Sequence, residues 1–170
     1  YCNSPSQNTL HKENRAGKFF RKKSLDKVRE ELTTLITRWK AEYVYFTADT
    51  FLAWSEEEFR SFIQMYREFQ LPFWIQTRPE TITEENVELL KGVGCHRVSL
   101  GIEHGNERFR REVVDRRISN EELIKRTNVV GRRIPVSVNN IPGFPTETRE
   151  LAFDTIRLNR ELTIDTMNCY

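Results

Sequence analysis

Several polar side chains of this sequence directly follow apolar runs, where they could bind a ligand. Asp49 follows the run 43–46, and Glu103 stands between Gly101 and Gly105. A carboxylate accepts hydrogen bonds from amines and hydroxyls, whereas glycine lets the backbone approach a ligand closely. We therefore interpret these loops as parts of one binding site.

A further loop and one arginine extend this candidate set. The run 135–141 leads into a loop that contains Gly143, and Arg78 follows the run 71–77. Glycine is free to adopt a positive φ, so the backbone at Gly143 could also meet a ligand.

Each carboxylate also has an ordinary structural interpretation. Asp49 could cap the turn before Trp54, and Glu103 could cap the turn at Asn106. The set of residues and its order in the chain, rather than any single member, therefore favour a binding site.

The spacing of apolar residues predicts helices that alternate with strands. Helices are predicted at 24–40, 55–69, 83–91, 119–133 and 148–161, and strands at 43–46, 71–77, 96–102, 135–141 and 164–169. Two of the helices begin with a capping-box sequence, at Ser55 and at Ser119. Residues 3–23 are polar and contain Pro5 and Gly17, and we expect them to form a loop.

This alternation implies parallel strands joined by right-handed crossovers, in either a barrel or an open doubly wound sheet. Ligands bind at the carboxyl ends of the strands in both architectures. Those ends carry Asp49, Arg78, Glu103 and the Gly143 loop. All four should therefore lie on one rim.

Composition limits the class of protein. The 170 residues, 38% of them hydrophobic, suffice for the core of one domain. The net charge of +2 is too small to indicate nucleic acid or an anionic membrane as a partner. No run approaches the ~18 apolar residues of a membrane span, so we expect neither a membrane-spanning segment nor a membrane as partner.

The metal-binding residue types are sparse. The three cysteines are widely spaced, which argues against a disulfide framework and fits a reducing compartment, so we expect a cytoplasmic protein. Cys2 by itself could be an incidental thiol, because iron–sulfur clusters usually need several thiolates. His11, His96 and His104 show no metal-ligand spacing. Cys95 and Cys169 are expected to be buried thiols, with a position facing the barrel as the alternative for Cys169, which lies near the carboxyl end of a strand.

The order Tyr1-Cys2, then 46–51, then the loops at 101–105 and 140–148 resembles the radical S-adenosylmethionine (SAM) enzymes, most closely the branch often fused to a cobalamin-binding domain. The resemblance implies an α/β fold, a partial (β/α)6 TIM-like barrel of parallel strands that lacks its first strand. It also implies that residues 1–170 are a fragment of the core domain, truncated at both ends, in which Tyr1-Cys2 ends a C-x3-C-x2-C cluster loop.

The same resemblance assigns roles to individual residues. Cys2 would be the last ligand of a [4Fe–4S] cluster, Asp49 would accept from the SAM amino group, and Glu103 would bind the ribose. Arg116, with Arg117 as the alternative, would pair with the SAM carboxylate, and Arg78 is predicted to join the cofactor-binding set. Ile141 and Gly143 would pack on the adenine as part of a GxIxGxxE segment. Asn139, Ala48 and the position of Glu147 depart from the family pattern.

The implied function is reductive cleavage of SAM to a 5′-deoxyadenosyl radical, for a radical transformation or a methyl transfer on an unidentified substrate. The implied cofactors are a [4Fe–4S] cluster and SAM, with cobalamin as a further cofactor held by an upstream domain. The implied partner is an electron donor such as flavodoxin or ferredoxin. The alternative is a non-catalytic or nucleic-acid-binding module that uses the basic segment 18–23 and Arg108, Arg110, Arg111, Arg116 and Arg117.

Overall fold

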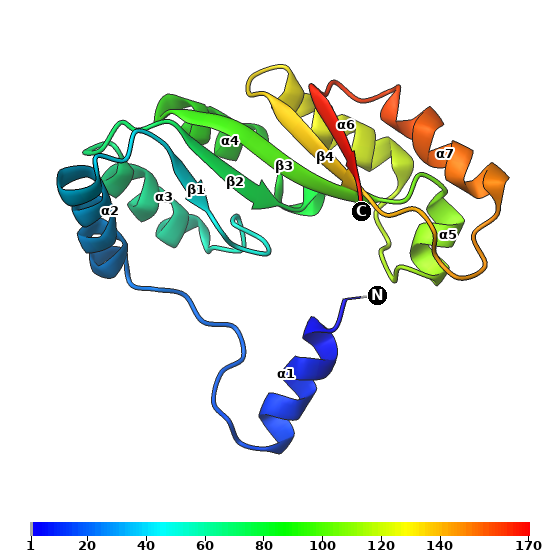
Figure 1. Cartoon of the computed structure of the whole chain (residues 1–170), viewed down its shortest axis with the longest axis horizontal. Coiled ribbons are helices and arrows are strands. Elements are labelled where there is room, and N and C mark those ends of the chain that lie inside the picture. The colour runs from blue at the N-terminus through cyan, green and yellow to red at the C-terminus, as the bar shows by residue number, and fades with distance from the viewer. Residues whose placement is uncertain (1) are drawn as a thin grey trace.

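The computed structural model of the chain describes residues 2–170, and its centre is one parallel five-stranded sheet (Figure 1). The strands are β1 (Val44–Phe46), β2 (Phe73–Thr77), β3 (Cys95–Glu103), β4 (Val136–Asn140) and β5 (Thr166–Cys169). Neighbours in the sheet are also neighbours along the chain. A doubly wound sheet reverses its strand order part-way, so the sequential order identifies the barrel type, here as an open arc.

The connections between strands are helical, as the apolar spacing predicts. The helices are α1 (Ser4–Glu13), α2 (Leu25–Trp39), α3 (Glu56–Tyr66), the 3-10 turn η1 (Pro79–Thr81), α4 (Glu84–Gly92), α5 (Glu107–Glu112), α6 (Asn120–Gly131) and α7 (Arg149–Asn159). The Ser55 capping box is confirmed. At Ser119 the hydroxyl accepts the expected amide, but the Glu122 carboxylate pairs with Arg126 instead of closing the box.

The prediction of a loop over residues 3–23 is wrong for its first half, because α1 is helical. Pro5 lies in the first turn of α1, where its missing N–H removes no helical hydrogen bond. Apolar periodicity could not reveal this helix, since none of its residues is buried. In Figure 1, α1 projects below the sheet, and residues 14–24 connect it to α2.

The two faces of the sheet differ in polarity because successive side chains of a strand alternate between them. On the face covered by α3, α4 and α6, Val98, Leu100 and Ile102 of β3 are fully buried in the core (Figure 1). On the opposite face, Trp74 donates its indole N–H to the Ser99 hydroxyl at 2.9 Å. This polar face corresponds to the interior of the barrel arc.

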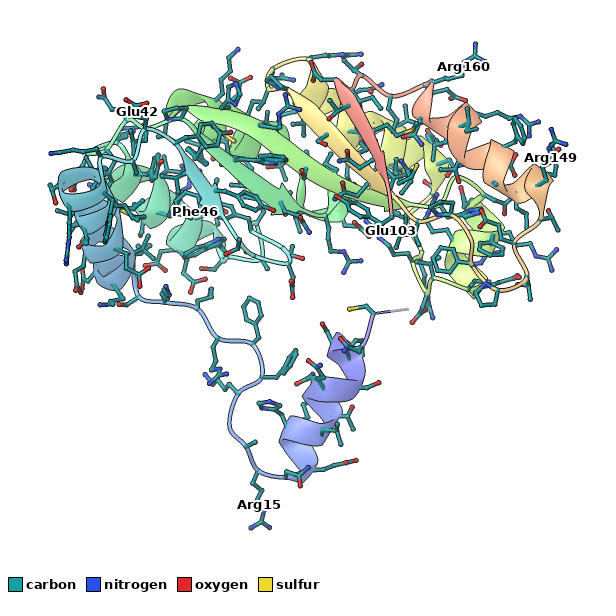
Figure 2. The ribbon with its side chains drawn as sticks, in the orientation of Figure 1. Arg15, Glu42, Phe46, Glu103, Arg149 and Arg160 are labelled. Atoms are coloured by element: carbon teal, nitrogen blue, oxygen red, sulfur yellow. The ribbon has the colours of Figure 1, made fainter. Side chains whose placement is uncertain are left out.

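The carboxyl ends of the strands lie along the lower rim of the sheet in Figure 2. Glu103 is on this rim, whereas Arg149 and Arg160 point away from the sheet at the two ends of α7. No helix among residues 2–170 combines the length and apolar character that crossing a membrane requires.

Candidate functional site

Glu103, at the end of β3, has an unusual backbone conformation. Its φ is +68°, a left-handed value that costs a non-glycine residue about 1–3 kcal/mol. In this conformation the side chain folds back over Gly101, where an added Cβ would lie 2.3 Å from Glu103 Oε1. Glycine at position 101 is therefore what allows the Glu103 carboxylate to lie against its own strand.

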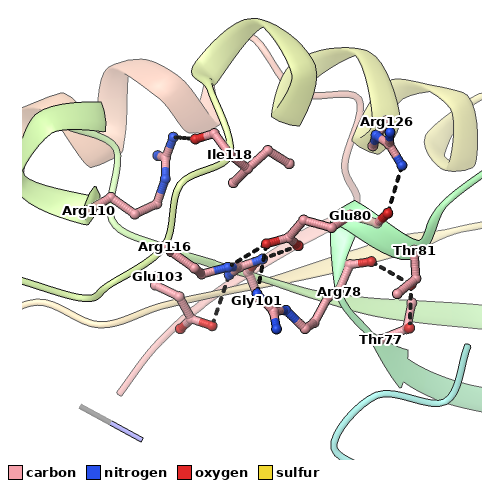
Figure 3. Close-up of polar contacts among 10 residues, drawn as sticks. All are labelled: Thr77, Arg78, Glu80, Thr81, Gly101, Glu103, Arg110, Arg116, Ile118 and Arg126. Carbon is pink, nitrogen blue, oxygen red and sulfur yellow. Dashed lines mark hydrogen bonds and ion pairs between the residues drawn. The ribbon is translucent and has the colours of Figure 1, made fainter. Parts of the chain in front are cut away.

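Arg116 holds one oxygen of this carboxylate (Figure 3). Its Nη1 donates to Glu103 Oε1 at 3.3 Å and to the Gly101 carbonyl at 2.6 Å. Glu103 Oε2 accepts no hydrogen bond within residues 2–170. Of the two arginines considered from the sequence, Arg116 is 6% exposed and in contact with Glu103, whereas Arg117 is exposed.

Glu80, in the turn η1 after β2, holds the other side of Arg116. Arg116 Nε donates to Glu80 Oε1 at 3.1 Å and Nη2 to Oε2 at 2.7 Å, a two-point carboxylate contact. Burial disfavours the charged form of Glu80, but the hydrogen bonds and charge of Arg116 outweigh it, and the pKa of Glu80 falls to about 2. The sequence interpretation missed Glu80, although it lies two residues after Arg78.

Arg78 belongs to the same cluster but is exposed. Its Nη2 donates to Glu80 Oε1 at 2.9 Å, and its carbonyl accepts from the Thr81 hydroxyl at 2.7 Å (Figure 3). Glu80 and Arg116 thus link Arg78 to Glu103, two residues that the sequence analysis placed on a common rim.

Asp49 and Cys2, although distant in the chain, lie near enough to interact electrostatically. Asp49 is exposed in the turn after β1, and its negative charge acts on the Cys2 thiol. Hydrogen bonds from the Ser4 side chain and backbone lower the pKa of Cys2, more than burial and Asp49 raise it. A lowered pKa favours the thiolate, which is the form that binds metal.

The loop after β4 is attached to Glu103 through the backbone. The Ile141 amide donates to the Glu103 carbonyl at 2.8 Å, and Gly143 has a φ of +84°. The Glu147 carboxylate accepts from the amides of Gly143 and Phe144. Glu147 therefore closes the loop on itself, with Ile141 and Gly143 held beside the end of β3.

His104 connects this loop to β3. Its Nδ1 accepts the Asn106 amide at 3.0 Å, so Nε2 carries the proton that is donated to Glu147 Oε1 at 3.1 Å. The imidazole is fully buried, with its ring 4.4 Å from that of Phe109. The sequence interpretation treated His104 as ordinary, because its partner, Glu147, is distant in the chain.

Arg110 organises the segment between Glu103 and Arg116. It is fully buried, and its guanidinium donates to the carbonyls of His104 and Ile118 and to the Asn120 side chain. Burial lowers its pKa, since the charge has been removed from water. Its carbonyl also accepts the Arg116 amide at 3.1 Å. Burial removes both Arg110 and Arg116 from the basic surface that the nucleic-acid-binding alternative requires.

A family comparison identifies the chain. The model of the radical SAM superfamily matches residues 1–158. The chain belongs to the radical SAM superfamily. It is 28% identical, over 151 residues, to an uncharacterized methyltransferase of Pyrococcus horikoshii. That alignment covers 88% of this chain and 33% of the relative, so the chain spans about a third of the relative's length.

Solved radical SAM structures share the fold. The radical SAM methyltransferase TsrM from Kitasatospora setae, with tryptophan and a SAM analog bound, superposes with a TM-score of 0.74 at 18% identity, over 87% of this chain and 30% of TsrM. The cobalamin-dependent radical SAM enzyme OxsB, with aqua-cobalamin bound, gives 0.67 at 12% identity, over 79% and 22%. At these identities the likeness shows the fold alone, and it confirms the partial barrel.

The polar groups of this radical SAM chain fit SAM chemically. SAM presents an amino group and two ribose hydroxyls as donors, and Asp49 and the open Oε2 of Glu103 are acceptors on one rim. Arg116 has little left to offer a SAM carboxylate, because Glu80, Gly101 and Glu103 already occupy all but one of its five N–H groups.

The described residues do not form a complete iron–sulfur site. No group of three or more Cys, His, Asp or Glu within residues 2–170 could hold a metal ion. Cys95 is buried in the core, where burial raises its pKa to about 12. Cys169 is exposed, contrary to the expectation of a buried thiol. Cys2 could therefore contribute only one thiolate of a larger ligand set.

Proposed function

We propose that this chain forms the SAM-binding part of a radical SAM enzyme. With SAM and a reduced [4Fe–4S] cluster bound, the cofactors supply the 5′-deoxyadenosyl radical by one-electron cleavage of the sulfonium C–S bond, for a radical transformation or methyl transfer. The protein residues bind and orient SAM. Because Cys2 is the one candidate cluster ligand among the described residues, we assign no step to the cluster.

The conformation of the Glu103 side chain is the observation that supports this proposal most directly. Its carboxylate is folded over Gly101, has one oxygen on Arg116 and leaves Oε2 open at the end of a parallel strand. In our proposal Oε2 accepts from the ribose hydroxyls. The backbone contact between Ile141 and Glu103 supports an adenine position beside the ribose, against Ile141 and Gly143.

Asp49 is proposed to accept from the amino group of SAM. It is exposed and carries no ion pair within residues 2–170, so its charge is open to a ligand. The proximity of its charge to Cys2 supports this placement, because in the family the same amino group binds next to the cluster.

The larger assembly is part of the proposal. The chain covers only about a third of its Pyrococcus relative and less of TsrM and OxsB, so the substrate-recognising residues would lie largely outside it. We propose an upstream cobalamin-binding domain, which the likeness to OxsB supports, and a flavodoxin or ferredoxin as electron donor. The residues of this chain name no substrate.

The Glu103 assignment is tested by SAM binding in the complete protein. We expect Glu103→Gln to weaken SAM binding, measured by calorimetry with the cluster loaded, by about 1–2 kcal/mol, the charge-assisted part of the hydrogen bonds, because the glutamine amide oxygen can still accept. The matched control is Glu112→Gln, on an exposed position of α5, which should bind SAM like the wild type. Unchanged affinity in Glu103→Gln would remove Glu103 from the site.

The Asp49 assignment is tested by separating charge from shape. Asp49→Asn keeps the shape but loses the charge-assisted part of the bond, so SAM cleavage should slow in a stable, cluster-loaded protein. If Asp49 only caps its turn, asparagine should serve nearly as well. Normal cleavage and normal stability together would contradict the assignment.

A further inference from the structure

The two-point contact between Glu80 and Arg116 has a consequence for how the ribose is bound. We propose that Glu80 is a positioning residue: by holding Arg116, it keeps Glu103 Oε2 open and thereby sets the preference of the site for a ligand with an intact ribose diol. This inference rests on the proposed role of Glu103 in binding SAM and assigns Glu80 no contact with SAM itself.

Arg116 is able to block Glu103 as well as to orient it. A guanidinium prefers to meet a carboxylate through two parallel N–H groups. Arg116 gives that two-point contact to Glu80, at 3.1 and 2.7 Å, and gives Glu103 only a single longer contact of 3.3 Å to Oε1. The two carboxylates therefore compete for one guanidinium, and Glu80 has the better geometry.

Burial makes this competition consequential. The side chain of Arg116 is 6% exposed and that of Glu103 14% exposed, so water solvates neither charge well. Without the charge of Glu80, the guanidinium would be left with Glu103 as its carboxylate partner. It would then be drawn onto both oxygens of Glu103, including the Oε2 that the ribose needs.

Glu80 is itself held in place, which it must be to control Arg116. It lies in η1, directly after β2, where Arg78 Nη2 donates to its carboxylate at 2.9 Å. Its carbonyl accepts Arg126 Nη1 from α6 at 2.7 Å. Figure 3 shows the resulting line from Arg126 through Glu80 and Arg116 to Glu103. The end of β2 thus fixes the acceptor geometry at the end of β3.

The test compares two ligands in the complete, cluster-loaded protein. Calorimetry measures the dissociation constants of SAM and of its 2′-deoxyribose analogue, and their ratio is the ribose preference. We expect the wild type to prefer SAM by about ten-fold or more, as befits a hydrogen bond to a carboxylate. Glu80→Gln should bring this ratio close to one, a change that a general loss of stability would not produce.

The matched control is Glu85→Gln, which removes the partner of Arg60 in an exposed ion pair nearby on α4. It should keep the wild-type ratio. If Glu80→Gln does not fold, Glu80→Asp is used instead; it keeps the charge but is too short to hold both Arg116 nitrogens, and should lower the ratio part-way. A wild-type ratio in the folded Glu80 variant would overturn the inference.

The outcomes also separate this inference from the proposed function. If the wild type shows no ribose preference, or if Glu103→Gln leaves that preference intact, Glu103 does not bind the ribose and both fail. If Glu103→Gln lowers the preference while Glu80→Gln retains it, the SAM site stands and Glu80 has no positioning role.

Discussion

Phe46 on β1 and Arg110 after β3 both pack inside the molecule, but their neighbours are of different kinds. Phe46 lies among the rings of Phe51, Phe62, Tyr66 and Phe73, at centroid distances of 5.4–5.7 Å. Arg110 is surrounded by the carbonyls and amide oxygen that its guanidinium binds. The β1–β2 half of the sheet is aromatic, and the β3–β4 half contains buried polar groups.

The two halves should therefore differ in how well they tolerate substitution. Apolar burial is non-directional, and a ring can be replaced by another side chain of similar volume at modest cost. Buried polar groups are costly whenever one partner is lost. In the β3–β4 half, such hydrogen bonds hold Glu103, Arg116 and the Gly143 loop in defined positions. Four substitutions or titrations test this contrast, given in order of expected effect.

The largest effect is expected from Arg110→Met. The apolar side chain fills a similar volume but leaves one buried and two part-buried acceptors without this donor, so the free energy of unfolding should fall by about 3–5 kcal/mol. Chemical denaturation measures this loss. Arg108→Met is the control, because Arg108 lies on the same helix, α5, with its side chain 79% exposed. Equal losses in the two variants would contradict a structural role for Arg110.

Glu147→Gln should cost less, about 2 kcal/mol, because it weakens the charged acceptor of the Gly143, Phe144 and His104 donors without changing its shape. Hydrogen exchange should accelerate at the Gly143 and Phe144 amides and remain unchanged in α3. Glu150→Gln, at an exposed position of α7, provides the control. If the Gly143 and Phe144 amides exchange at the same rates in the variant and the wild type, Glu147 does not hold the loop.

The contribution of the Glu80–Arg116 pair to the free energy of unfolding should decrease in acid. The pKa of Glu80 is lowered from 4.5 to about 2, so the stability that the pair contributes is complete above about pH 4.5 and is lost as the pH falls toward 2. The difference in unfolding free energy between wild type and Glu80→Gln should therefore shrink across this window, from at most about 2 kcal/mol once solvent screening is allowed for. A difference that stays constant from pH 6 to pH 3 would argue against the ion pair.

The smallest effect is expected in the aromatic half. Tyr66→Phe removes only the hydroxyl that donates to the Leu71 carbonyl at 3.1 Å, and should lower the unfolding free energy by about 1 kcal/mol. The ring contacts with Phe62 and Phe73 remain. If Tyr66→Phe lowered the free energy of unfolding as much as Arg110→Met does in the same denaturation experiment, the contrast between the two halves would be wrong.

The arrangement of the fold was readable from the sequence because it depends on local patterns. The apolar periods of α2 and α3, and the short β-branched and aromatic runs of β1 to β4, set the alternation of helix and strand. That alternation implies parallel strands and a common rim, which is why Asp49, Arg78 and Glu103 could be grouped before any contact was known. Helix α1 escaped prediction because it buries nothing and so has no apolar period.

Pairing between residues distant in the chain was decided by the tertiary structure. Glu80 meets Arg116 and His104 meets Glu147 only because η1, the α5–α6 segment and the loop after β4 converge at the carboxyl ends of neighbouring strands. The choice between Arg116 and Arg117 was equally invisible, since it depends on which side chain points at Gly101. Sequence patterns report which face of an element is apolar, whereas a buried hydrogen bond depends on distance and direction between elements, which exist only once the chain has folded.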